Sequence, residues 1–86
     1  MAKYKIEIRI SAVKEIKKLP ARDLKKILTT ISSLAENPRP NGCVKLSIDD
    51  KYRISVGVYK ILYEIKDKLL VIIVVKVAHR KDVYNS

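Results

Sequence analysis

The chemistry available to this sequence lies in its cationic and phenolic side chains. His79 is the single histidine and Cys43 the single cysteine, which excludes a two-imidazole ribonuclease mechanism and a cysteine–histidine zinc cluster. The adjacent Asp49 and Asp50 point apart, so a two-metal site is not expected, and neither a P-loop nor a GxGxxG segment is present. We therefore expect no metal and no cofactor. Only cationic groups and tyrosines are left, and the catalytic candidates among them are Arg53, Lys60, Arg80 and Tyr84.

These four side chains are of the types that metal-free RNA cleavage needs. The 2′-hydroxyl must lose a proton, the phosphorane must be stabilised, and the 5′-oxygen must gain a proton. Arginine binds phosphate oxygens bidentately, and lysine supplies a compact positive charge. A tyrosine among several cations has a pKa lowered from about 10, so it can accept a proton. The set predicts phosphodiester cleavage.

Periodic patterns predict the elements that would position these residues. Residues 4–10 alternate apolar with charged side chains, as a half-buried strand does. Ser11 is expected to cap a short helix, and residues 24–35 carry one apolar stripe of a second helix. Pro20 either ends the first helix or opens the second. The rest reads as four strands joined by short turns, at residues 44–48, 52–56, 58–65 and 69–77.

The order β-α-α-β-β-β-β predicts an α+β fold with two helices on one face of a twisted antiparallel sheet of four to five strands. If the strands around Gly57 form a hairpin, alternation places Arg53 and Lys60 on one face. The apolar last strand is expected inside the sheet, with both faces largely covered. It ends in KVAHRKDVY, from which Arg80 and Tyr84 are predicted to reach that face.

Length and charge limit the class of protein. A chain of 86 residues forms one domain, 1–86, because it can build only one core. Nineteen Lys and Arg against nine Asp and Glu give a net charge of +10, which attracts RNA, DNA, an anionic membrane or an acidic protein. The N-terminus has no signal-peptide core, and the longest apolar run is too short for a membrane helix. We expect a cytoplasmic protein with no membrane partner.

The chain resembles the RelE/ParE superfamily of type II toxin–antitoxin toxins, most closely the RelE-like members. The similarity runs from SAVKEIKKLP and ENPRP to VKLSIDDKYRISVGVYKILYEI and VVKVAHRKDVY. It implies a RelE-like, microbial-RNase-type fold and a ribosome-dependent mRNA endoribonuclease (mRNA interferase) that needs no metal. It also implies a RelB-like antitoxin, bound as a heterodimer or heterotetramer, and contacts with mRNA on the ribosome and 16S rRNA. Arg53, Arg80 and Tyr84 match the family's active-site positions.

Departures from the family pattern keep two alternatives open. Lys60 replaces the usual arginine of the GxYR segment, Ser55 stands where many members have a basic residue, and Val58 replaces a frequent acid. One alternative is therefore a catalytically weakened member. The other is a ParE-like inhibitor of DNA gyrase, which acts by binding alone. Further RNA-binding candidates are Lys45, Lys51, His79 and Lys81.

Overall fold

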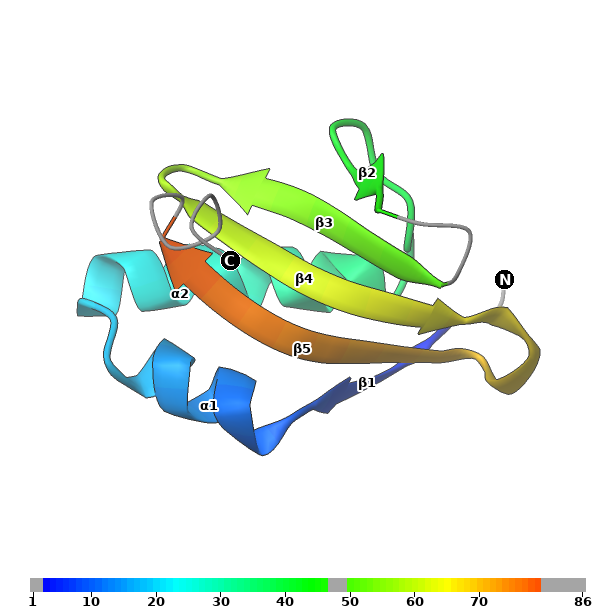
Figure 1. The fold of residues 1–86 in the computed structure, drawn as a ribbon, viewed down its shortest axis with the longest axis horizontal. Helices are drawn as coiled ribbons and strands as arrows, with labels where there is room; N and C mark the ends of the chain where they lie inside the picture. The colour runs from blue at the N-terminus through cyan, green and yellow to red at the C-terminus, as the bar shows by residue number, and fades with distance from the viewer. Residues whose placement is uncertain (1–2, 47–49, 80–86) are drawn as a thin grey trace.

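The computed structural model describes residues 3–46 and 50–79. The predicted element order is confirmed (Figure 1). The elements are β1 (Lys5–Ile8), α1 (Ile10–Lys17), α2 (Ala21–Leu34), β2 (Val44–Lys45), β3 (Lys51–Val56), β4 (Tyr59–Lys66), a 3-10 turn (Asp67–Leu69) and β5 (Val71–His79). Three site candidates, Arg80, Lys81 and Tyr84, lie outside the described residues.

The five strands form one sheet in the order β1-β5-β4-β3-β2. The strands β2 to β5 are antiparallel neighbours, as their short turns predict. The expectation of a wholly antiparallel sheet is wrong at one edge, because β1 runs parallel to β5 and the sheet is mixed. A parallel pair needs a long crossover connection, and the chain between β1 and β5 supplies it with both helices and three strands.

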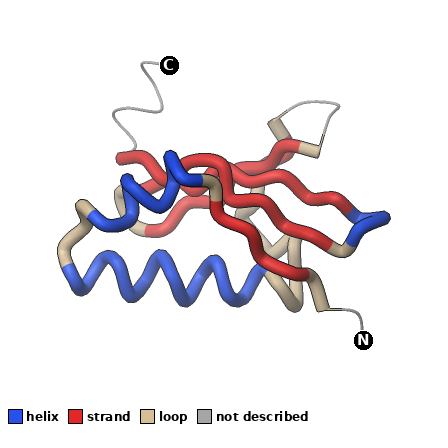
Figure 2. Tube along the Cα trace, turned by 90° about the horizontal axis from the view of Figure 1, so that it is seen from below, coloured by secondary structure: helices blue, strands red, loops and turns tan. Residues whose placement is uncertain are grey.

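The long helix α2 lies on one side of the sheet, α1 lies next to β5, and the side of the sheet away from α2 is open (Figure 2). The core forms between α2 and the sheet face that it covers; its largest fully buried side chains are Ile27, Leu34, Ile61, Tyr63, Ile65, Ile72 and Val74. On the open side, Val71, Ile73 and Val75 of β5 are only half-buried. The last strand therefore lies inside the sheet, as predicted, but the helices cover only one of its faces.

The helix starts differ in part from their predicted positions. The residue before α1 is Arg9, which makes no side-chain cap, and the Ser11 hydroxyl instead donates to the Val75 carbonyl oxygen at 3.2 Å. Ser11 thus ties α1 to β5 and is not a cap. Pro20 directly precedes α2, where its fixed φ and missing N–H suit a helix start. None of the helices within the described residues has the length and apolar character to cross a membrane.

A polar clamp holds three distant segments together at the β4–β5 turn. The Arg39 guanidinium donates to both carboxylate oxygens of Asp67, at 3.3 and 2.8 Å, and to the Tyr52 hydroxyl at 3.1 Å. The Tyr4 hydroxyl donates to the same Asp67 carboxylate at 2.6 Å. The Tyr63 hydroxyl donates to the Pro38 carbonyl oxygen at 2.8 Å, in the same loop as Arg39. The loop after α2 is thereby fastened to the sheet.

Replacing Asp67 with asparagine is expected to lower the melting temperature near neutral pH. Hydrogen bonds from Arg39 and Tyr4 hold the pKa of Asp67 below its ordinary value. A carboxyl whose pKa is lowered on folding stabilises the fold above its unfolded pKa, about 3.9, and loses that contribution as pH falls through its folded value. Thermal melts of D67N and the parent should therefore differ near neutral pH and converge in strong acid. The exposed Glu36→Gln is the control, and an equal difference at both pH values would contradict this assignment.

Candidate functional site

Arg53 and Lys60 lie on the open face of the sheet, on neighbouring strands. In the β3–β4 hairpin, Arg53 is paired with Leu62 and Ser55 with Lys60. Directly paired residues of antiparallel strands project to the same side, whereas Tyr52 and Ile54 point to the core. Gly57, with a φ of +59°, makes the turn between the strands. The predicted shared face of Arg53 and Lys60 is confirmed.

Lys60 and Ser55, which differ from the family pattern, lie on this face and are hydrogen-bonded to each other. The Lys60 ammonium donates a hydrogen bond to the Ser55 hydroxyl. A second basic residue at position 55 would place two cations side by side, and the hydroxyl avoids that repulsion. Arg53 makes no hydrogen bond or ion pair within residues 3–46 and 50–79, so its guanidinium can bind an incoming anion.

The predicted RNA-binding residues do not form one group. Lys51 pairs with Glu64 and so shares the open face with Arg53. Lys45 pairs with the core-facing Tyr52, and His79 pairs with Tyr59, which places both on the other face. Strand alternation alone would have put His79 on the open face with Val71 and Ile73. A β-bulge between β4 and β5 shifts the register near Leu62, and a shift of one residue reverses every later side chain.

The end of β5, which leads directly to Arg80 in the sequence, is held by both helices. On α1, the Glu15 carboxylate accepts from the Val77 backbone N–H at 3.2 Å and from the Lys76 ammonium at 3.1 Å. On α2, the Asp23 carboxylate accepts from the Tyr59 hydroxyl at 2.9 Å. The Tyr59 ring lies edge-on to His79, with 5.8 Å between ring centroids. These contacts fix the end of β5 at His79. The sequence alone did not predict them.

Three described tyrosines have a raised pKa, so they hold their protons more tightly than free tyrosine and are less available as phenolate bases. The hydrogen bond to Asp23 raises the pKa of Tyr59, and the hydrogen bond to Asp67 raises that of Tyr4. Burial, followed by the neighbouring Cys43, raises the pKa of Tyr63. A lowered phenol pKa at Tyr84 stays a prediction. Within the described part of the chain, no three His, Cys, Asp or Glu side chains gather where they could hold a metal ion.

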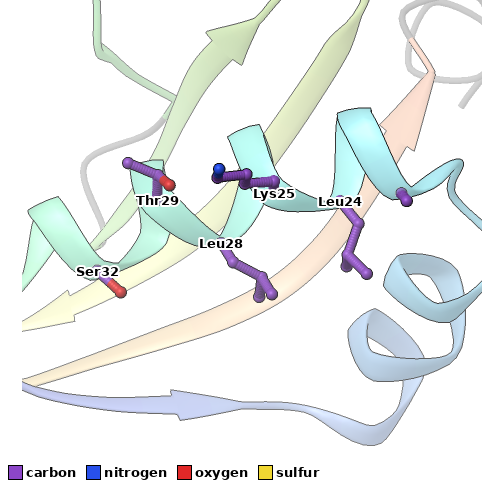
Figure 3. A pocket seen from close by; sticks show the side chains of 6 residues that line it. Leu24, Lys25, Leu28, Thr29 and Ser32 are labelled. Atoms are coloured by element: carbon purple, nitrogen blue, oxygen red, sulfur yellow. The ribbon is translucent and has the colours of Figure 1, made fainter.

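A shallow groove runs along the exposed side of α2. It is lined by Ala21, Leu24, Lys25, Leu28, Thr29 and Ser32. Leu24 and Leu28 project from the same side of the helix (Figure 3), and Leu28 is 42% exposed. The apolar stripe predicted for this helix therefore divides into a buried part, with Ile27 and Leu34, and a margin with the half-buried Leu24 and the exposed Leu28.

Three comparisons with known proteins agree with the fold. The model of the ParE toxin of the type II toxin–antitoxin system parDE matches residues 6–84. A protein of Methanocaldococcus jannaschii named as toxin RelE1 is 28% identical over 88 residues, which cover 98% of each chain. The archaeal RelE–RelB complex from Pyrococcus horikoshii OT3 contains a chain with a TM-score of 0.83 and 29% identity, covering 93% of this chain and 97% of that one. The RelB–RelE antitoxin–toxin complex from Methanococcus jannaschii gives a TM-score of 0.75 at 29% identity, covering 92% of this chain and 95% of that one.

Proposed function

The chain belongs to the RelE/ParE superfamily of type II toxin–antitoxin toxins, and we propose that it cleaves mRNA on the ribosome without a metal ion. Cytoplasmic ribosomes and their 16S rRNA are then its partners, and a RelB-like antitoxin neutralises it. The observation that carries this proposal is the pair Arg53 and Lys60, which share the open face between neighbouring strands. A guanidinium that makes no hydrogen bond or ion pair within the described residues, on the same face as an oriented ammonium, suits a phosphate group.

The proposed chemistry divides between the sheet and the terminal segment. Arg53 and Lys60 bind the scissile phosphate and stabilise the charge that develops on its oxygens. Arg80 adds a third cation and donates a proton to the leaving 5′-oxygen. Tyr84, with its pKa lowered by these cations, takes the proton from the attacking 2′-hydroxyl. The product is a 2′,3′-cyclic phosphate and a free 5′-hydroxyl.

The groove on α2 suits an amphipathic helix of the antitoxin. Leu24 and Leu28 offer an apolar strip of the kind that helical peptides occupy. Lys25 lines the groove, and further basic residues lie on α1, on α2 and between them: Lys14, Lys17, Lys18, Arg22 and Lys26. A bound segment with apolar residues on one side and acidic residues at its margins would match both features. RelB-bound relatives of the same fold support a protein partner for this chain.

Induction of the chain from a tightly regulated promoter tests the catalytic assignment. We expect the parent to arrest growth and to produce cleaved transcripts. The Arg80→Ala variant should do neither, because it lacks one of the cations that stabilise the transition state. Co-expression of the cognate antitoxin should restore growth to the parent. The assignment fails if both forms arrest growth equally, or if cleaved transcripts never appear.

A second candidate function is inhibition of DNA gyrase by binding alone. The observation that favours it is the matching model, which is that of the ParE toxin. The basic segment with a terminal tyrosine, HRKDVY, favours RNA cleavage instead. A gyrase supercoiling assay beside a translation assay separates the two functions, since a gyrase inhibitor would block only supercoiling and an mRNA endoribonuclease would block only translation.

A further inference from the structure

The open face of the sheet contains a small hollow beside Arg53. It has a volume of about 200 Å³ and is lined by Leu46, Lys51, Tyr52, Leu62, Tyr63, Glu64 and Val75. Leu62 is the direct cross-strand partner of Arg53, so the hollow begins at the strand position that pairs with Arg53. Glu64 lies two residues further along β4, roughly 7 Å away. A nucleotide whose phosphate is held by Arg53 would therefore have this hollow within reach of its base.

The β-bulge forms one wall of the hollow. Leu62 pairs with Lys76 and Tyr63 pairs with Val74, which leaves Val75 as the extra residue of β5. Bulges bend and twist a sheet locally and often lie next to functional sites. Here the bulge turns Val75 towards Leu62, with Leu46 on the far side of β3. The floor is aliphatic and suited to the flat face of a heterocyclic base.

Glu64 is an unexpected residue on a face that binds phosphate. Its side chain is only 16% exposed, and a carboxylate here repels the RNA backbone. Lys66 neutralises it incompletely, because the Lys66 ammonium lies 3.0 Å from Asp50 and 3.6 Å from Glu64. Lys66 does not line the hollow, whereas Lys51, the cross-strand partner of Glu64, does. The hollow thus presents one acceptor and one donor side by side on neighbouring strands, next to apolar side chains.

We infer that this hollow is a specificity subsite that receives a guanine base of the RNA substrate. Guanine presents two adjacent N–H donors, at N1 and N2, which fit the two oxygens of one carboxylate, and its O6 next to them accepts from Lys51. Uracil has a single N–H between two carbonyl oxygens, and adenine and cytosine each place an acceptor beside their amino group. Single-stranded RNA exposes these base edges for recognition. Phosphate contacts position a nucleic acid and base contacts select its sequence. Glu64 therefore determines which base is bound, whereas Arg53 binds the phosphate of any nucleotide.

The inference rests on the proposed function for its substrate, but its test requires neither ribosomes nor cleavage. Guanosine, adenosine, cytidine and uridine 5′-monophosphates are titrated into the ¹⁵N-labelled full chain, and the amide shifts of residues 62–64 and 75 are followed. Guanosine monophosphate should bind most tightly and shift these amides most. Glu64→Gln should weaken its binding by about 5- to 150-fold, the loss expected for one bidentate base contact, and should bring the four nucleotides close together.

Glu7→Gln is the matched control, because Glu7 is exposed on β1 and its substitution removes the same charge two strands away. It should leave the order of the four nucleotides unchanged. Equal binding of all four by the parent, or shifts confined to the phosphate-binding residues around Arg53, would overturn the inference. A guanine preference found in a chain that cleaves no mRNA would uphold the subsite and reject the proposed function.

Discussion

Replacing Arg53 with alanine is expected to slow single-turnover cleavage of ribosome-bound mRNA by about 100-fold or more, as removal of one transition-state donor does in other enzymes. The guanidinium makes no other hydrogen bond or ion pair within the described part of the chain, so its loss should affect chemistry and not the fold. The melting temperature of R53A should therefore stay close to that of the parent. Cleavage is measured with purified protein on ribosomes programmed with a defined mRNA.

Lys45→Ala is the control for this substitution. It removes the same charge from the neighbouring strand β2, but its register places Lys45 on the opposite side of the sheet. If charge alone mattered, K45A and R53A would slow cleavage equally. We expect the cleavage rate of K45A to stay within a few-fold of that of the parent. Equal losses of rate would contradict the division of the sheet into a catalytic face and a covered face.

Replacing Leu34 with alanine is expected to destabilise the fold by about 2–5 kcal/mol, because deleting a buried leucine side chain removes burial and leaves a cavity. Leu34 is fully buried at the end of α2. A small domain has a total stability of only about 5–15 kcal/mol, so a large part of it depends on this side chain. Denaturant unfolding measures the loss.

Leu28→Ala is the matched change on the same helix. Leu28 is 42% exposed in the groove, so its removal should cost within about 1 kcal/mol of stability. It should instead weaken binding of the antitoxin, if the groove holds an antitoxin helix. Equal destabilisation by both substitutions would mean that Leu28 belongs to the core, and unchanged antitoxin affinity would remove the groove from the interface.

The parts of this fold that the sequence predicts are those set by local periodicity. The two-residue alternation on either side of Gly57 suffices to place Arg53 and Lys60 on one face, because a hairpin fixes the register of its strands. The apolar stripe of α2 is likewise read directly from its spacing. Both predictions depend on residues close in sequence, and both are confirmed.

The features that the sequence does not predict depend on long-range pairing. The parallel contact of β1 with β5 joins segments more than 60 residues apart. The bulge at Val75 leaves no visible mark in an unbroken apolar run, yet it moves His79 to the helix side and forms the hollow beside Glu64. Ser11 resembles a helix cap in sequence, but its hydroxyl bonds to the Val75 carbonyl. The roles of Arg80 and Tyr84 stay predictions from their sequence pattern.

We propose that this toxin cleaves mRNA on the ribosome through the cationic face of its sheet. Primer extension on mRNA from ribosomes programmed with one defined start codon, treated with the purified parent, R53A or no protein, tests it most directly. We expect the parent to give a primer-extension stop at a new 5′-end inside the A-site codon, where the downstream fragment begins with a 5′-hydroxyl, and R53A to give almost none. Intact mRNA after treatment with the parent, under conditions in which the same protein inhibits gyrase supercoiling, would contradict it.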